Sequence, residues 1–335
     1  MKYQTPEFIE KKGVVLSKEH VPYDSALVFN AGVNRFKDGY AMLFRNDYGF
    51  CRQDFDDFFA GISDNTTPKT NIGAAFSKDG INWQVSPEPV FELKDKSISR
   101  AYDPRLTAME DGSYGVCFAV DSSCGVRGGI AVTSDMKNFE VKSVSVPENR
   151  NMALFPEKIN GCYYRLERPF LSLNKKFSTW LSSSPDLIHW GNSALVLDAR
   201  QVPFANDKIG PAAPPVKTPQ GWLTLFHAVE EQESVFDSWC RRWKKCYYGG
   251  VMLLDLEDPS KIIAIADRPL LVPEEEYELC GFRGGVIFPG GLIAEPDGTA
   301  KIYYGAADTV ECLATAKIDD LIDFCFKYDM AKDLQ

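Results

Sequence analysis

The fold can be predicted from the segment Tyr102-Asp-Pro-Arg-Leu-Thr-Ala-Met-Glu-Asp-Gly-Ser-Tyr-Gly-Val-Cys-Phe118. This segment contains a short apolar strand, an Asp-Gly turn and a second strand rich in apolar and aromatic residues. Asn or Asp followed by Gly readily takes the positive φ values of a tight turn, so the segment predicts a β-hairpin. The same pattern recurs at residues 29–45, 151–167, 210–226 and 286–304. Hairpins repeated along a chain indicate a repeat architecture.

A shorter motif follows each hairpin. The segments 77–83, 134–139 and 184–190 share a Ser, an Asp and a closing aromatic residue, and 254–260 and 316–321 resemble them. We expect each motif to link the two outer strands of one repeat. Hairpins followed by outer strand pairs predict an all-β protein, namely a five-bladed β-propeller with four-stranded blades and a central active-site channel.

The repeats predict a single propeller domain over residues 1–335. Residues 1–24 are expected to be an irregular lead-in segment, and residues 319–335 a C-terminal tail whose first part, 319–330, is the one good helix candidate. Two stretches are too long for simple connections, 48–69 and 230–247, and both carry several aromatic residues. Long aromatic loops bind ligands or form interfaces, so a sugar platform and an oligomer contact are equally open, and we expect a homo-oligomer.

Bulk composition narrows the function. The chain has 335 residues and a formal net charge of −10, which argues against a nucleic-acid or anionic-membrane partner. It has no apolar run long enough for a transmembrane helix and no signal-like N-terminus. Nine scattered cysteines without a Cys-x-x-Cys pair favour reduced thiols in a cytoplasmic protein. Three widely spaced histidines make a zinc centre improbable, so no metal or cofactor is expected.

Equivalent positions of the repeats should meet at the channel, because the inner strands of a propeller converge on one axis. Polar residues fall at the inner-strand entrances and at the ends of the second strands: Asn30, Asp103, Arg150, Lys208 and Arg283, and Arg45, Arg168, His227 and Asp308. Cations gathered on one axis would repel one another if nothing lay between them. A bound polyanion relieves this repulsion, and arginine forks match phosphate oxygens.

Each of these residues also has a purely structural alternative. Arg150 and Arg168 could pair with Glu157 and Glu167. Lys208 could pair with its neighbour Asp207, and His227 could be a satisfied polar residue near a strand end. The matching repeat positions favour the shared site over these separate explanations.

Asp103 lies between Arg100 and Arg105 and precedes Pro104. A residue before proline is biased away from the helical conformation, so we expect an extended backbone that points Asp103 into the channel. Arg105 is expected to support the site from a different depth on the same face. An inverting glycosidase needs an acid and a base, but phosphate as nucleophile makes the base unnecessary. One acid facing a phosphate cradle therefore predicts an inverting glycoside phosphorylase.

The sequence resembles glycoside hydrolase family 130, the β-mannoside phosphorylases. The matching segments span nearly the whole chain: Phe29-Asn30, Leu43-Phe-Arg45, Tyr102-Asp-Pro-Arg105, Arg150, Arg165-Leu-Glu-Arg-Pro169, Lys208-Ile-Gly-Pro211, Leu225-Phe-His227 and Tyr303-Tyr-Gly-Ala-Ala-Asp308. The family fold is a five-bladed β-propeller.

The resemblance implies a role for each matching residue. Asp103 would be the general acid, acting through the mannose 3-hydroxyl. Phosphate would bind to Arg45, Arg150, Arg168, Lys208, His227 and Tyr247, although Tyr248 is an adjacent candidate for the last position. The mannosyl residue would bind to Asn30, Tyr102 and Asp308. The products would be α-mannose 1-phosphate and a shortened acceptor, without a cofactor or metal.

The form Tyr102-Asp-Pro-Arg105 and the compact chain resemble the mannooligosaccharide and mannosyl-N-acetylglucosamine branch of the family. We therefore expect a cytoplasmic β-1,4-mannooligosaccharide phosphorylase whose partners are β-1,4-mannooligosaccharide and inorganic phosphate. Acceptors such as glucose or N-acetylglucosamine stay open. An inverting β-mannosidase and a non-catalytic sugar-binding propeller are the rival hypotheses.

Overall fold

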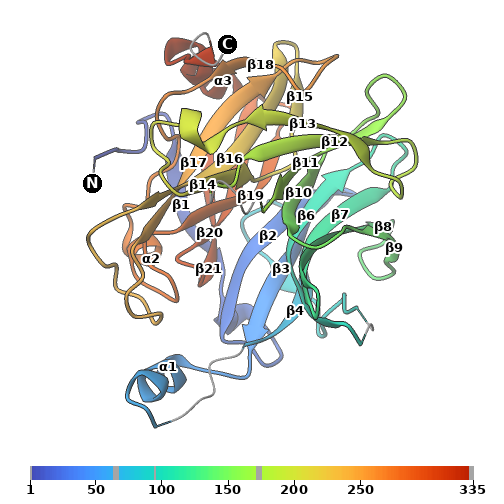
Figure 1. Cartoon of the computed structure of the whole chain (residues 1–335). Helices are drawn as coiled ribbons and strands as arrows, with labels where there is room; N and C mark the ends of the chain where they lie inside the picture. The colour runs from blue at the N-terminus through green and yellow to red at the C-terminus, as the bar shows by residue number, and fades with distance from the viewer. Residues whose placement is uncertain (1, 63–67, 94–95, 171–175, 332–335) are drawn as a thin grey trace.

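A computed structural model of the chain describes residues 2–62, 68–93, 96–170 and 176–331. Its strands form five antiparallel sheets, which are the blades of a β-propeller (Figure 1). The predicted architecture is therefore confirmed. Each predicted hairpin supplies the two inner strands of one blade.

The blades follow one another along the chain. Blade 1 contains β2 (Leu27–Phe36), β3 (Gly39–Tyr48), β4 (Lys69–Ser77) and β5 (Gln84–Val85), and blade 2 contains β6 (Ile98–Ala108), β7 (Tyr114–Ser122), β8 (Gly125–Thr133) and β9 (Glu140–Val144). Blade 3 contains β10 (Asn149–Leu154), β11 (Tyr163–Pro169), β12 (Thr179–Ser184) and β13 (Gly191–Leu197). Blade 5 contains β19 (Ile287–Ala294), β20 (Thr299–Ala306), β21 (Val310–Lys317) and, from the N-terminus, β1 (Glu10–Leu16).

Blade 4 departs from the four-strand prediction. Its inner strand is split into β14 (Lys208–Pro211) and β15 (Val216–Thr218), which both pair with β16 (Gly221–Glu231). Pro214 and Pro215 lie in the gap, and proline has no N–H to donate to a strand ladder. β17 (Lys245–Leu254) and β18 (Ile262–Ile265) complete the blade.

The N-terminal segment closes the ring, which corrects the expectation of an irregular lead-in. β1 pairs with β21 and becomes the outer strand of blade 5. Lys11 Nζ on β1 donates to Glu278 Oε2 over 2.7 Å, and the Glu278 side chain is completely buried. Segments from near the two ends of the chain, β1 and β21, are therefore joined in the sheet of blade 5.

The motifs with a Ser, an Asp and a closing aromatic residue link the third and fourth strands in blades 1 to 3. In the first, Ser77 Oγ accepts a hydrogen bond from Gly80 N, and Asp79 Oδ1 accepts from Ile81 N and Asn82 N. Such side-chain to backbone bonds stabilise a tight turn. In blade 4, Asp255 caps a comparable link. The fifth link was predicted wrongly at 316–321, because α3 (Ile318–Lys327) begins there instead.

Helices are few among the described residues. α3 confirms the predicted C-terminal helix, while α1 (Arg52–Phe59) in the first long insertion was not predicted. α2 (Glu276–Leu279) and two 3-10 turns, η1 (Lys18–His20) and η2 (Ala199–Gln201), complete the set. Among the described residues no helix is long and apolar enough to cross a membrane.

Candidate active site

The inner strands of blades 1 to 3 carry equivalent bulges. In each, two consecutive residues oppose one on the neighbouring strand: 30–31 on β2, 103–104 on β6 and 151–152 on β10. The first residue of each pair has a left-handed backbone, with φ of 54° at Asn30, 53° at Asp103 and 56° at Asn151. Asn and Asp tolerate this region better than other residues with side chains. The bulges thus bring three short polar side chains to the same cavity.

The extended backbone predicted for Asp103 is therefore wrong. Pro104 biases the preceding residue against the right-handed helical region, but the bulge and the tolerance of Asp for positive φ decide the outcome. The bulge also separates Asp103 from Arg105. The Arg105 side chain is buried and donates to the carbonyl oxygens of Ala212 and Pro104, so it links β6 of blade 2 to the inner segment of blade 4, as a supporting residue should.

A cavity of 890 Å³ occupies the end of the channel where these bulges lie. It is lined by nearly all of the predicted residues, namely Asn30, Arg45, Tyr102, Asp103, Arg150, Arg168, His227, Tyr247 and Asp308. Lys208 does not line it. Arg283, which was predicted at the channel without a role, also lines the cavity. The structure adds residues that the predicted roles left out, among them Arg100, Asp121, Asn151 and Phe282.

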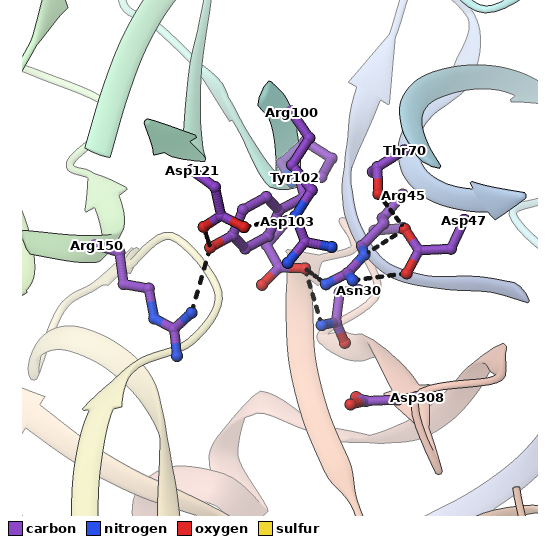
Figure 2. Close-up of polar contacts among 12 residues, drawn as sticks. Asn30, Arg45, Asp47, Thr70, Arg100, Tyr102, Asp103, Asp121, Arg150 and Asp308 are labelled. Atoms are coloured by element: carbon purple, nitrogen blue, oxygen red, sulfur yellow. Dashed lines mark hydrogen bonds and ion pairs between the residues drawn. The ribbon is translucent and has the colours of Figure 1, made fainter. Parts of the chain in front are cut away.

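The carboxylate of Asp103 is held by two donors (Figure 2). Its Oδ1 accepts from Asn30 Nδ2 over 3.0 Å and from Arg45 Nη1 over 3.2 Å. Burial by itself would raise the pKa of Asp103, but the charges of Arg45 and Arg105 outweigh burial and lower that pKa. The carboxyl is thus ionised at neutral pH when the cavity holds no other anion.

The guanidinium of Arg45 is held in place by the carboxylate of Asp47. Its Nε and Nη2 donate to Asp47 over 2.9 and 2.6 Å, and Thr70 Oγ1 also donates to Asp47 (Figure 2). Burial opposes its charge, but the charges of Asp47 and Asp103 prevail and raise the pKa of Arg45. A bidentate pair of this kind fixes the guanidinium plane, so Arg45 orients Asp103.

Tyr102 joins the acid to a second ion pair. Its hydroxyl donates to Asp121 Oδ1 over 2.8 Å, and Arg100 Nε donates to the other oxygen of Asp121 over 2.6 Å. Arg150 Nη1 donates to the Tyr102 hydroxyl over 3.4 Å (Figure 2). Burial raises the pKa of Tyr102 to about 12, so the phenol stays protonated. The network positions the tyrosine ring between the acid and Arg150.

Two arginines in the cavity have no carboxylate partner. Among the described residues, neither Arg150 nor Arg168 forms an ion pair, because Glu157 pairs with Lys217 and Glu167 pairs with Arg165. The structural alternative for these two arginines is therefore wrong. Burial, and then the charge of Arg150, lower the pKa of Arg168 to about 9. Two neighbouring cations of this kind are stabilised by an anion that binds between them.

His227 lies against Arg168 at the buried end of the cavity. Arg168 Nη1 is 2.8 Å from His227 Nε2, and since arginine can only donate, Nε2 is the acceptor and the ring proton lies on Nδ1. Burial and the charges of Arg168 and Lys208 lower the pKa of His227 well below its ordinary value. His227 Nδ1 and Arg168 Nε are buried and have no hydrogen-bond partner in the part of the chain that the structure describes. This end of the cavity therefore contains donors that no described residue accepts from.

Tyr247 and Lys208 border this group. The Tyr247 ring stacks on His227 with centroids 6.1 Å apart and lines the cavity, whereas the hydroxyl of buried Tyr248 donates to Glu230. The geometry thus favours Tyr247 over its neighbour. Lys208 Nζ lies 3.3 Å from Asp207, so its structural alternative is present, although Nζ also lies 5.6 Å from the Tyr247 ring centroid.

Asp308 lies on the side of the cavity away from Tyr102 and Asp121. Its Oδ2 accepts from Arg283 Nη1 over 2.9 Å, and its backbone φ of 49° is again left-handed. Burial raises the pKa of Asp308 in spite of the attraction of Arg283. Figure 2 shows Asp308 apart from the Tyr102 and Asp121 group, with Asn30 and Asp103 between them. A sugar ring placed over Asp103 would have polar groups on both sides.

Both long insertions reach this side of the cavity. Phe55 of α1 and Cys240 of the second insertion line it together with Phe282. Arg241 Nη2 bonds to Asp56 over 2.9 Å, and the rings of Phe55 and Trp239 lie 6.5 Å apart, so the insertions contact each other. Residues 63–67 of the first insertion lie outside the described residues. The insertions close the cavity next to Asp308, which favours a functional role for them.

Among the described residues, no group of three or more His, Cys, Asp or Glu side chains is placed to hold a metal ion. That no metal or cofactor is needed stays a prediction.

The comparisons with known proteins agree with this geometry. A family model described as β-1,4-mannooligosaccharide phosphorylase, that of glycoside hydrolase family 130, matches residues 3–327. The chain belongs to this family. Family 130 is a family of mannoside phosphorylases, and the chain is accordingly an enzyme that transfers a glycosyl group to phosphate.

Individual relatives differ in the linkage that their names give. A β-1,2-mannobiose phosphorylase from Listeria innocua is 34% identical over 76% of this chain and 69% of its own length. A β-1,4-mannooligosaccharide phosphorylase from Ruminococcus albus is also 34% identical, over 79% of this chain and 80% of its own length. The solved structure of the Listeria innocua enzyme with β-1,2-mannobiose is similar in fold, with a TM-score of 0.81 and 27% identity over 95% of this chain and 99% of that one.

Proposed function

We propose that this family 130 enzyme is an inverting phosphorylase that removes the non-reducing-end mannosyl residue of β-1,4-mannooligosaccharides. One observation carries the phosphorylase assignment: Asp103 lies in the same cavity as the buried Arg168 and the partly buried Arg150, which form no ion pair among the described residues. Such cations supply the charge that a phosphate nucleophile needs when it leaves water.

The reaction follows from this arrangement. Phosphate bound to Arg150, Arg168 and His227 attacks the anomeric carbon from the side opposite the leaving group. The bond to the glycosidic oxygen breaks, and that oxygen takes a proton from Asp103, directly or through the mannose 3-hydroxyl as the family resemblance implies. The products are α-mannose 1-phosphate and the shortened acceptor, and Asp103 is left as a carboxylate that must take up a proton before the next turnover.

A hydrolytic reaction is less well supported by the same residues. An inverting hydrolase needs a second carboxylate as base for water. Of the other described carboxylates that line the cavity, Asp121 is paired with Arg100, Asp308 is paired with Arg283, and Glu92 is exposed. Among the described residues the cavity therefore offers no buried carboxylate that is free of an arginine partner and could serve as this base.

The β-1,4 linkage rests on the family model and on the Ruminococcus albus relative. A β-1,2-mannoside phosphorylase is a second candidate, because the Listeria innocua enzyme is equally identical and its structure is similar. Glucose and N-acetylglucosamine as acceptors remain further possibilities for the leaving sugar.

The test is to incubate the protein with β-1,4-mannobiose or β-1,2-mannobiose, each with and without inorganic phosphate. We expect phosphate-dependent release of α-mannose 1-phosphate from the β-1,4 substrate. Release from the β-1,2 substrate alone would transfer the assignment to the second candidate. Mannose released at the same rate without phosphate would refute the phosphorylase, and no turnover of any mannoside would favour a sugar-binding protein.

We also propose a cytoplasmic homo-oligomer. Phosphorolysis conserves the energy of the glycosidic bond only if the sugar phosphate stays inside the cell. Phe58 and Phe59 on α1 are 42% and 40% exposed, which is unusual for adjacent aromatic rings on a protruding helix (Figure 1). Light scattering of the purified chain tests the assembly, and a monomer at assay concentration would refute it.

A further inference from the structure

A second groove lies between blades 2 and 3, outside the catalytic cavity. It has a volume of 440 Å³ and shares no lining residue with the catalytic cavity among the described residues. The blade 3 strands separate the two, because neighbours on a strand point to opposite faces: Arg150 and Arg168 line the catalytic cavity, while Asn149 and Glu167 line the groove.

The floor of this groove is one polar face of the blade 3 sheet. Strand register places Asn149 opposite Pro169, Glu167 opposite Trp180 and Arg165 opposite Ser182. Register partners present their side chains on the same face of a sheet. All of these residues line the groove.

A buried ion pair occupies the centre of the floor. Arg165 Nη2 lies 2.8 Å from Glu167 Oε2, and each side chain is 6% exposed. Arg165 also covers the Trp190 ring, with the guanidinium 4.1 Å from the ring centroid. Burying such a pair costs more free energy than packing apolar side chains of similar size. Its charges cancel, so the groove is suited to an uncharged ligand with many hydroxyl groups.

Two polar atoms of the groove residues have no hydrogen-bond partner among the described residues. Asn149 is 8% exposed, its Nδ2 donates to Glu167 over 2.9 Å, and its Oδ1 is buried without a hydrogen bond. The Trp180 Nε1 donor is also buried and unpaired. A sugar supplies hydroxyl groups that both donate and accept, which is what one free acceptor and one free donor require.

The rim of the groove includes exposed apolar side chains. Val146 is 77% exposed and Ile188 is 49% exposed, and both line the groove. A pyranose ring has C–H faces that pack on apolar side chains and hydroxyl edges that need polar partners. The volume is in the range of pockets that enclose small ligands.

We propose that this groove is a second carbohydrate-binding site, which takes one neutral hexopyranose unit of a β-mannan oligosaccharide. The choice of mannose rests on the proposed function, whereas the polar floor and apolar rim argue for a sugar independently of it. Occupancy would hold a long substrate on the enzyme between successive turnovers in the catalytic cavity.

The experiment follows the indole N–H signal of Trp180 by nuclear magnetic resonance, with that signal assigned by its loss in Trp180→Phe. β-1,4-Mannotetraose is added without phosphate, so that no phosphorolysis occurs, and cellotetraose is added in parallel. Ser193→Phe fills the groove from an exposed position on β13, and Ser193→Ala is the matched control at the same position.

We expect a saturable shift of the Trp180 signal with mannotetraose in the wild type and in Ser193→Ala, and its loss in Ser193→Phe. The kcat/KM for β-1,4-mannobiose should stay within about twofold in both variants, because neither touches the catalytic cavity. A signal that never moves, or that moves equally in Ser193→Phe, overturns the site. A shift with cellotetraose alone overturns the mannan occupant. If no mannoside is turned over but the Trp180 signal still shifts with mannotetraose, the groove stands and the proposed function falls.

Discussion

Asp103→Asn removes the proposed acid and little else. An Asn side chain keeps an oxygen that can accept from Asn30 and Arg45, and Arg45 retains both of its hydrogen bonds to Asp47. The thermal unfolding midpoint should therefore stay close to that of the wild type. What the variant loses is the proton that the leaving sugar needs.

The expected loss depends on the leaving group. General acid catalysis contributes roughly 10²- to 10⁴-fold, which is about 3 to 5 kcal/mol in the barrier. The kcat/KM for β-1,4-mannobiose should fall by about this factor, because an alkoxide is a poor leaving group. With 2,4-dinitrophenyl β-mannoside the leaving phenolate needs no proton, and the loss should be less than about tenfold.

Asp308→Asn is the matched control, since it makes the same isosteric change in a second buried, ion-paired carboxyl of the cavity. It should affect both substrates by the same factor, because Asp103 remains. Phosphate-dependent rates on the two substrates, measured by release of mannose 1-phosphate, give the comparison. Asp103→Asn activity within tenfold of wild type on mannobiose, or equal losses on the two substrates, would refute the acid role.

Other consequences can be measured on the same protein. The charges of Arg45 and Arg105 lower the pKa of Asp103, so kcat/KM for mannobiose should fall as the pH rises above that pKa. Saturating phosphate should move this fall in kcat/KM to higher pH. A pH profile that does not change with phosphate would contradict the coupling between phosphate and Asp103. Arg168→Gln should raise the KM for phosphate about 10- to 100-fold, the equivalent of one or more charge-assisted hydrogen bonds. The thermal unfolding midpoint of Arg168→Gln should be equal to or higher than that of the wild type, because burial disfavours the charge of Arg168 and lowers its pKa. A lower midpoint together with an unchanged KM for phosphate would show a structural role instead. Lys11→Met should lower the free energy of unfolding, measured with urea, by about 3 kcal/mol, because it leaves the buried carboxylate of Glu278 without its cation. A loss below about 1 kcal/mol would mean that the other donors to Glu278 stabilise its charge without Lys11.

The blades were predictable because each hairpin carries its own turn signal within a few residues. Strand β1 was not, since the segment 10–16 is short and charged and its partner β21 lies some three hundred residues away, so no local pattern marks the pairing. Helix α1 was missed for a related reason. This eight-residue segment of aromatic and acidic residues is helical where Phe55 packs on Trp239 and Phe282, which come from distant parts of the chain.

The site residues were predictable from their positions in the repeat, but not their pairings. Asn30 and Asp103 occupy matching places in two copies as predicted, but the matching place in the third copy belongs to Asn151 and not to the predicted Arg150. The sequence does not show that a bulge turns each of these three residues to positive φ. The partner Asp121 of Tyr102 was missed because it lies on the neighbouring strand β7, where strand register decides the contact. The partner Asp47 of Arg45 lies two residues further along the same strand, β3, and its contact depends on how the two side chains turn.

The cations of the cavity create a difficulty that phosphate itself resolves. A general acid must carry a proton, yet Arg45, Arg105 and Arg150 all lower the pKa of Asp103 when the cavity holds no phosphate. A phosphate on Arg150 and Arg168 adds negative charge at the same place and offsets these fields, so it raises the pKa of Asp103 as it binds. The nucleophile would thus prepare the acid as well as attack the sugar. The enzyme would then be protonated for catalysis only when phosphate is present, which protects a bound mannoside from reaction with water.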